Sequence, residues 1–340
     1  MNKILLDEAE IKFIKTLLDE LMVEFDSVDS PSFLKDVVIY ASELPRRLRR
    51  FLNDFKVLEP SGACVIAGYP IDDHKIGRTP DHWNLRSDRS STLEEEILFV
   101  LFSSLLGDPI GWITQQDGYI IHNVVPIKGH ENLQLSSGSQ YILWHIEDAF
   151  HHYRGDYVSL MCLRNPDNTP TTFASIDMVQ LDTRQIEILF EPRFIIRPDG
   201  SHATENNTDL QDQSQEIDTM LNSTYQAFNL MQTSPQKVSV LFGSPKSPYI
   251  CIDPYLMDSM DGEAQLALDT LIQALDSKLS ECVLHPGDFL FIDNYKTVHG
   301  RGPFNPRYDG TDRWLKRMNI TRDLRKSRDS RTDCSSHIIY

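Results

Sequence analysis

Short strand-like runs, each bounded by turn residues, fill the sequence from about residue 112 onward and constrain the fold most strongly. They are rich in β-branched and aromatic residues, which favour strands. They include YIIHNVVP, QYILWHI, YVSLMCL, RFIIRP, VSVLFG and DFLFID. Many short strands at this spacing are typical of a sandwich or a barrel. The sequence therefore predicts a fold that is mainly β.

Helical periodicity is confined to a few segments, three of them before this β-rich region and one within it. Apolar residues recur at three- and four-residue steps within them. The predicted helices cover residues 7–26, 33–54 with a break near Pro45, 92–107 and 262–281. In the third of them, Thr92 is the expected N-cap and Glu95 the expected partner in a capping box. We therefore expect a β core flanked by helices.

No linker or internal repeat divides the chain, so we expect a single domain over residues 1–340. Its predicted parts are N-terminal helices in residues 1–60 and a core in residues 61–322. A polar stretch at about 200–217 interrupts that core, and we expect it to be a lid loop. Residues 323–340 are also polar and predict a loosely held tail.

The charge balance restricts the partners of this chain. It has 33 Lys and Arg against 50 Asp and Glu, a formal net charge of −17. Nucleic acids and anionic membranes need clustered cations, so neither is expected as a partner.

The five cysteines form no C-x-x-C pair, and no signal peptide or membrane-spanning run is visible. We expect a cytoplasmic protein with a small-molecule ligand, and a homodimer or higher homo-oligomer is possible.

The first segment that suggests chemistry is QYILWHIEDAFHHYRGDY. His145 and Glu147 are two residues apart, and on a strand such positions point to the same face. An imidazole and a carboxylate could therefore reach one metal ion. An H-x-E triplet is common by chance, so it is weak evidence when taken alone.

The second segment, HPGDFLFIDNYKTVHGRG, continues to Arg313 and Arg317. Its late histidine, His299, could complete a set of two histidines and one carboxylate. That set leaves metal positions open and suits non-haem Fe(II). A guanidinium nearby could hold a carboxylate of a small molecule by two parallel hydrogen bonds. The two segments together are much stronger evidence than either one.

Through these two segments the sequence resembles the Fe(II)/2-oxoglutarate-dependent oxygenases of the clavaminate-synthase-like group. WHIEDAFHHYRGDYVSLMCLRN in particular resembles hydroxylases of free amino acids. The resemblance runs from about Gly107 to Met318. It implies a double-stranded β-helix core, a jelly-roll of the cupin kind, with His145, Glu147 and His299 holding Fe(II). It also implies 2-oxoglutarate and O2 as co-substrates.

The resemblance also assigns roles to residues around the iron. Arg313 matches the arginine that pairs with the distal carboxylate of 2-oxoglutarate, and Thr172 matches a second position on that co-substrate. The positions that match the amino acid site are Arg317, one of Gln115 and Gln116, Asp199, Ser201 and Asp253. We expect Asp288 and Asn294 to fix the end of a strand and to orient His299 through hydrogen bonds.

The side chain of the amino acid is predicted from the acids at the distal end of that site. Relatives that bind a guanidinium tend to carry a second acid two residues before Asp253, and here that residue is Cys251. A compact ammonium needs fewer acceptors than a guanidinium does. The expected reaction is therefore hydroxylation of C4 or C3 of free L-lysine, giving succinate and CO2. Arginine or ornithine is the alternative substrate.

Two other function classes remain open at this stage. A catalytically inert relative could bind an amino acid without oxidising it, although all three ligand positions are present. A zinc hydrolase could use the same two histidines and carboxylate. That function would leave Arg313 without a role.

Overall fold

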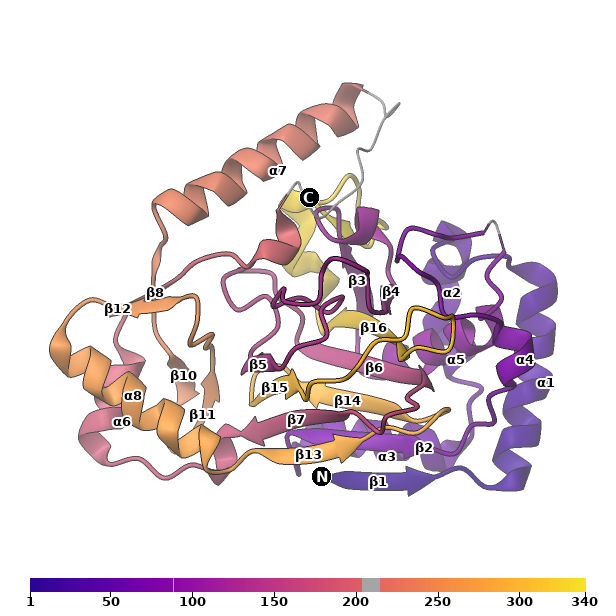
Figure 1. The fold of residues 1–340 in the computed structure, drawn as a ribbon, viewed down its shortest axis with the longest axis horizontal. Helices are drawn as coiled ribbons and strands as arrows, with labels where there is room; N and C mark the ends of the chain where they lie inside the picture. The colour runs from indigo at the N-terminus through magenta and orange to yellow at the C-terminus, as the bar shows by residue number, and fades with distance from the viewer. Residues whose placement is uncertain (88, 204–214) are drawn as a thin grey trace.

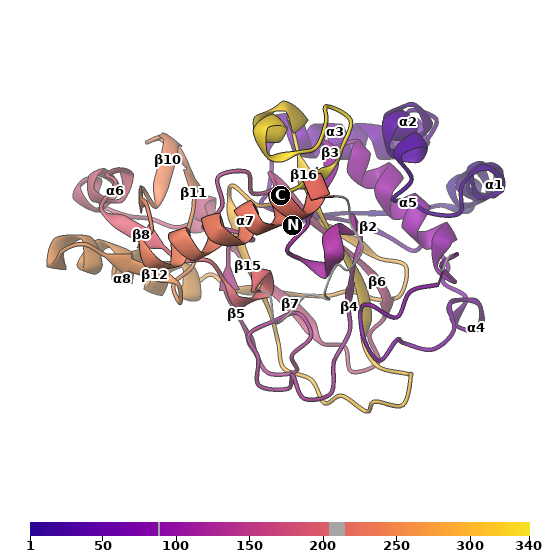
Figure 2. The same cartoon turned by 90° about the horizontal axis from the view of Figure 1, so that it is seen from above.

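Two β-sheets face each other in the computed structural model, which describes residues 1–87, 89–203 and 215–340 (Figures 1 and 2). The larger sheet has the order β1 (Asn2–Leu5), β2 (Ala63–Ala67), β14 (Phe289–Asp293), β6 (Tyr157–Arg164), β16 (Trp314–Thr321), β3 (Asp108–Trp112) and β17 (Ile338–Ile339), with β4 (His122–Val124) also paired to β16. The smaller sheet has the order β13 (Ser280–Val283), β7 (Pro170–Ser175), β15 (Thr297–Arg301) and β5 (Ile142–His145). The fold is thus β-rich, as expected.

Two smaller groups of strands and a set of helices surround this pair of sheets. The strands are the hairpin β10 (Leu241–Ser244) and β11 (Ser247–Ile250), and the group β12 (Met257–Ser259), β8 (Phe194–Ile196) and β9 (Lys237–Val238). The helices are α1 (Glu8–Glu24), α2 (Pro31–Ala41), α3 (Arg46–Leu58), α4 (Asp73–Ile76), α5 (Leu93–Ser104), α6 (Thr183–Phe190), α7 (Gln215–Thr233) and α8 (Gly262–Asp276). Short 3-10 turns cover Gln116–Gly118, Ile176–Met178, Gly200–His202 and Leu324–Ser330.

The helices lie on the outside of the sheets. In Figures 1 and 2, α1, α2 and α5 gather at one end of the molecule, whereas α6 and α8 lie at the other end. Among the helices that the structure describes, none combines the length and the apolar character that crossing a bilayer requires.

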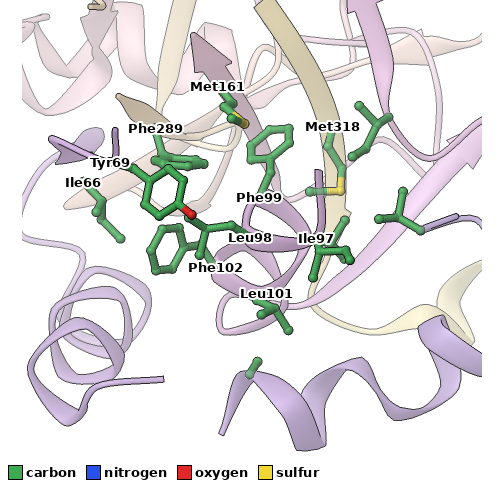
Figure 3. Packing of buried hydrophobic residues seen from close by; sticks show 14 of the residues in the cluster. Ile66, Tyr69, Ile97, Leu98, Phe99, Leu101, Phe102, Met161, Phe289 and Met318 are labelled. Atoms are coloured by element: carbon green, nitrogen blue, oxygen red, sulfur yellow. The ribbon is translucent and has the colours of Figure 1, made fainter. Parts of the chain in front are cut away.

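Strand alternation separates the helix-covered face of the larger sheet from its inner face. On β14, Phe289 and Phe291 pack in the cluster formed with the N-terminal helices, and Leu290 and Ile292 pack between the sheets. Figure 3 shows Phe99 and Phe102 of α5 beside Phe289. Each such aromatic side chain contributes about 1.5–3 kcal/mol when fully buried. This packing anchors β14, whose far end leads into the functional site.

Two local predictions are corrected by the structure, and a third lies largely outside the residues that it describes. Thr92 makes no capping hydrogen bond to α5, because its hydroxyl donates to the Glu96 carboxylate instead. One carboxylate oxygen of Glu95 is buried without a partner, so the expected capping box does not form. In the proposed lid, residues 204–214 lie outside the described part of the chain, while Gln215 begins α7.

The C-terminal segment is also more ordered than predicted. Residues 338–339 form β17, which pairs in parallel with β3 of the larger sheet. Arg331 and His337 are buried beneath it, and Arg331 donates to several backbone carbonyls of the same segment. The prediction of a loose tail is therefore wrong. A polar sequence can satisfy its hydrogen bonds internally as well as in water.

Candidate active site

A cavity of about 380 Å³ opens between the two sheets. The smaller sheet contributes His145 and His299 to its wall, and the larger sheet contributes Leu315 and Arg317. Every second residue from 313 to 317, at the start of β16, points into the cavity. Trp314 and Met318 point to the opposite face and pack against the helices. The spacing of four between the two arginines therefore acts as two strand steps.

Three ligand atoms converge in this cavity. The ligand atoms of His145, Glu147 and His299 all lie within 4.8 Å of one another. Oε2 of Glu147 is 3.6 Å from Nε2 of His145 and 3.4 Å from Nε2 of His299. Nδ1 of His145 donates to the Leu143 carbonyl at 2.9 Å, which turns Nε2 toward the cavity. Two imidazoles and one carboxylate on one side of a cavity suit a divalent transition metal.

Charge around this cluster favours an ionised Glu147. Burial opposes that charge, but Arg317 and the two histidines outweigh burial and hold the pKa of Glu147 well below its usual value. For His145, burial alone would lower the pKa, whereas the hydrogen bond to Glu147 raises it to about 9. The pKa of buried His299 is lowered. A metal that binds here would displace a proton from His145.

The backbone of Glu147 is positioned by an asparagine. Strand β5 ends at His145, so Glu147 lies in the following turn and not on the strand as expected. Oδ1 of Asn294 accepts from the Glu147 amide at 2.9 Å, and its Nδ2 donates to the Glu147 carbonyl at 3.0 Å. The same Nδ2 also donates to the carbonyl of Gly155. Asn294 therefore orients Glu147, and the prediction that it orients His299 is corrected.

We expect Asn294→Ala to weaken metal binding at this site by about tenfold, because the turn that carries Glu147 loses its clamp. The measurement is an anaerobic Fe(II) titration of both proteins, with thermal melting as a check on the fold. The exposed Asn53 on α3 offers a matched control as Asn53→Ala. Equal Fe(II) affinity in the wild type and in Asn294→Ala would contradict this role.

Asp288 lies away from the metal cluster, at the opposite end of β14 from Asn294. Its carboxylate accepts from the backbone amides of Gly68 and His285 and approaches Lys3. These contacts fix the Pro-Gly-Asp turn that enters the strand. Asp288 thus fixes one strand end as expected, but none of these contacts reaches a histidine of the cluster.

Arg313 is buried in the cavity wall without a carboxylate partner among the described residues. It is 5 % exposed, its Nε has no hydrogen-bond partner, and burial lowers its pKa to about 10. A buried, unpaired guanidinium is costly unless a ligand brings negative charge. The donor set therefore fits a carboxylate group of a ligand.

The threonine that faces the cavity is Thr171, and the prediction of Thr172 is corrected. In the pairing of β15 with β7, His299 lies opposite Phe173 and Arg301 lies opposite Thr171. Because directly paired residues share a face, Thr171 points toward the cavity together with His299, and Thr172 points to the other face. Thr171 accordingly lines the cavity.

Gln115 and Gln116 have different roles although both line the cavity. Oε1 of Gln115 accepts from Arg317 at 3.0 Å, and its Nε2 donates to Ser201 at 2.5 Å. The amide of Gln116 instead pairs with the backbone N–H and carbonyl of Asn123, both at 2.9 Å. Gln115 is therefore the glutamine that contacts Arg317, the residue predicted to bind the substrate. Arg317 also donates to Glu147 and to His122.

Two aspartates also line the cavity near the metal cluster. Asp199 caps the turn Gly200–His202, and Asp253 precedes Tyr255 in an irregular segment after β11. Burial raises the pKa of Asp253, and the nearby charge of Asp199 raises it further, whereas His145 lowers it. Two carboxylates near each other favour a cationic ligand between them.

A buried pair of His202 and Asp148 lies beside the cavity and was not predicted. Nε2 of His202 lies 3.0 Å from Oδ1 of Asp148, and its Nδ1 lies 2.6 Å from Thr114. The Asp148 backbone has a positive φ of 51°. The pair joins the turn that carries Asp199 to the turn that carries Glu147. The adjacency of Asp148 to Glu147 was the only sequence signal, because His202 follows in a polar stretch.

Comparison with known proteins agrees with this geometry. The family model "Taurine catabolism dioxygenase TauD, TfdA family" matches residues 100–319. Enduracididine beta-hydroxylase of Streptomyces hygroscopicus is 45% identical, over 98% of both chains. L-ornithine/L-arginine 3-hydroxylase of Catenulispora acidiphila is 39% identical, over the whole of both chains.

A solved structure is similar over the full length. The non-heme iron oxygenase OrfP, in complex with Fe, succinate and (3S)-hydroxy-L-Arg, is 42% identical over all of both chains with a TM-score of 0.93. Together with the family model, these similarities cover the metal cluster and both sheets. The chain therefore belongs to the TauD/TfdA family, as an Fe(II)- and 2-oxoglutarate-dependent oxygenase related to clavaminate synthase and to hydroxylases of free amino acids.

Proposed function

We propose that this enzyme hydroxylates the β-carbon, C3, of a free basic L-amino acid, with arginine or ornithine as the substrate class. One observation carries the proposal: a single cavity is lined by arginines, among them Arg313 and Arg317, and by the two aspartates Asp199 and Asp253. A zwitterionic amino acid with a cationic side chain matches that distribution of charge. The names of the relatives, a beta-hydroxylase and a 3-hydroxylase, support C3 over C4.

The proposed metal ligands are His145, Glu147 and His299. Iron(II) bound with 2-oxoglutarate and O2 supplies the oxidant that converts C–H into C–OH, while 2-oxoglutarate becomes succinate and CO2. The protein's part is to hold the metal on one face and to leave the other positions open. Asn294 holds the turn of Glu147 in place through its two backbone hydrogen bonds.

The proposed co-substrate anchor is Arg313. Its guanidinium is buried and pairs with no acid among the described residues, so the distal carboxylate of 2-oxoglutarate would balance its charge. Thr171 also lines the cavity and could add a hydroxyl donor. Thr172 has no such role, because it lies opposite Gly300 and points to the other face of the sheet.

The proposed amino acid site begins at Arg317. Its guanidinium would pair with the α-carboxylate, and Gln115 beside it would accept from the α-ammonium. Ser201 holds Gln115 in position, and Asp199 and Asp253 would receive the side-chain cation. This arrangement orients the backbone of the substrate at both ends, which fixes the carbon that is nearest the metal.

Arginine or ornithine replaces lysine as the proposed substrate. The lysine prediction counted Cys251 as a missing acid, but Cys251 packs in the core and its thiol donates to the Ala149 carbonyl. The second acid is instead Asp199, which comes from a different segment. Paired carboxylates suit a guanidinium with five donors. Relatives named for lysine hydroxylation are also less similar to this chain.

The fold and domain organisation support the same proposal. We infer that residues 1–340 form one domain of the double-stranded β-helix type. Strand β1 from the N-terminus and β17 from the C-terminus both join the larger sheet, which supports a single cooperative unit. The two facing sheets with the metal cluster between them support a jelly-roll core.

The test compares kcat/KM over arginine, ornithine, lysine and citrulline, with Fe(II) and 2-oxoglutarate present. Citrulline has nearly the shape of arginine but a neutral side chain. We expect arginine or ornithine to be the best substrate, with citrulline lower by about 100-fold because two carboxylates would lack a cation. Equal rates with arginine and citrulline, or no stimulation by any basic amino acid, would overturn the proposal.

A further inference from the structure

A second arginine lines the cavity without a carboxylate partner. Arg301 ends β15, two residues after His299, and it is 4 % exposed. Its guanidinium donates to three backbone carbonyls: Nη2 to Gln140 at 2.7 Å, Nη1 to Ser136 at 3.3 Å and Nε to Gly302 at 3.3 Å. No salt bridge neutralises it within the described residues. Its positive charge is therefore buried and fixed in place.

Arg301 and Arg313 flank the same aromatic ring. The guanidinium carbon of Arg301 lies 4.9 Å from the ring centroid of Phe304, and that of Arg313 lies 5.9 Å from it. Burial lowers the pKa of Arg301 to about 9, and the charge of Arg313 contributes to this shift. Two buried cations beside one ring raise the free energy of the empty cavity, so a ligand with negative charge there is stabilised.

We propose that Arg301 is a specificity-determining residue for the co-substrate, because its fixed charge beside Arg313 selects a 2-oxo acid that carries a second carboxylate. This inference rests on the 2-oxoglutarate part of the proposed function. Arg313 would contact the distal carboxylate directly, and Arg301 would act on it through space. Two guanidinium groups carry more charge than one carboxylate neutralises. The charge of Arg301 therefore still attracts a carboxylate that is bound to Arg313.

The segment whose carbonyls accept from Arg301 also forms part of the cavity wall. Ser136 belongs to the segment 130–140, and Ser136 and Ser137 both line the cavity. The amide of Phe304 donates to Ser139 of the same segment. Removal of Arg301 could therefore alter the shape of the cavity as well as its charge. A lysine keeps the charge but cannot reach three carbonyls, so Arg301→Lys separates the two effects.

The experiment measures the binding of 2-oxoglutarate and of its 5-methyl ester to the Fe(II)-loaded enzyme by anaerobic calorimetry. In the ester a neutral methoxycarbonyl group replaces the distal carboxylate, and the 2-oxo acid end is unchanged. We expect the wild type to prefer 2-oxoglutarate. Arg301→Met should reduce that preference about tenfold, and Arg301→Lys should keep most of it. If Arg301→Met weakens both ligands equally or leaves the preference unchanged, the inference is wrong.

Two further variants separate this inference from the proposed function. Arg331 is also buried and donates to backbone carbonyls, but it lies in the C-terminal segment, so Arg331→Met should leave the preference unchanged. Arg313→Met should abolish the preference. If the wild type shows no preference for 2-oxoglutarate, the proposed co-substrate site fails. If only Arg313→Met lowers the preference, the role of Arg301 alone fails.

Discussion

Glu147→Gln is expected to bind Fe(II) at least about 100-fold more weakly than the wild type and to lose hydroxylation in proportion. Glutamine has the shape of glutamate but not its charge, and Glu147 is the only anion among the three converging ligands. The change also removes the carboxylate that pairs with the half-buried Arg317, whose other acceptors are the amide of Gln115 and the imidazole of His122. Anaerobic titration with Fe(II) measures the affinity, and succinate formation measures the activity.

Glu281→Gln provides the matched control for this variant. Glu281 is exposed on β13, in the same sheet as His145 and His299, so it tests whether any loss of charge on this sheet matters. We expect its Fe(II) affinity to equal that of the wild type. A Glu147→Gln variant that retained full Fe(II) affinity would exclude Glu147 as a ligand. His145→Ala provides an independent test of the same site.

Asp253→Asn is expected to lower kcat/KM for arginine by about 100-fold while changing kcat/KM for citrulline little. Asparagine preserves the shape of the side chain but removes the charge that would face the guanidinium. Citrulline has no such charge, so its binding does not depend on this carboxylate. The comparison of the two substrates separates an electrostatic contact from a general disturbance of the cavity.

Asp258→Asn is the control for the specificity prediction. Asp258 lies five residues further along, is exposed and pairs with Arg197 on the surface. Its replacement should leave both substrates unaffected. An equal loss of kcat/KM for arginine and citrulline in Asp253→Asn would remove Asp253 from the account of specificity. A loss confined to arginine in Asp258→Asn would instead indicate long-range electrostatics.

The parts of the site that the sequence predicted are those whose chemistry depends on residue type and close spacing. His145 and Glu147 are near in the sequence, and they meet His299 because β5 pairs with β15 at His145 and His299. The same applies to Arg313 and Arg317, which lie two strand steps apart at the start of β16. Residue type and spacing suggested a metal site and a carboxylate site here. The resemblance to the oxygenase family assigned each residue its role.

The parts that the sequence did not predict depend on contacts between distant segments. Strand register decided between Thr171 and Thr172, and a one-residue shift moves a side chain to the other face. Hydrogen bonding with Asn123 decided that Gln116 is structural. Asn294 clamps Glu147 across a large sequence separation, which no local pattern could reveal.

The substrate prediction depended most heavily on tertiary structure. The lysine prediction rests on Cys251, which occupies the position where relatives that bind a guanidinium tend to carry a second acid. The chain leaves β11 at Ile250, so strand alternation no longer applies there, and Cys251 packs in the core. Asp199 reaches the cavity from a segment more than fifty residues earlier. The sequence already predicted Asp199 at the substrate site, but the choice of lysine over arginine considered only the residue at position 251.

The central claim is tested most directly by the products formed from L-arginine and L-ornithine with Fe(II), 2-oxoglutarate and O2. We predict that one amino acid of this pair gains one oxygen atom at C3, located by NMR spectroscopy, with succinate formed in equal amount. Succinate formation that neither amino acid stimulates, or turnover without a hydroxylated product, would contradict the account.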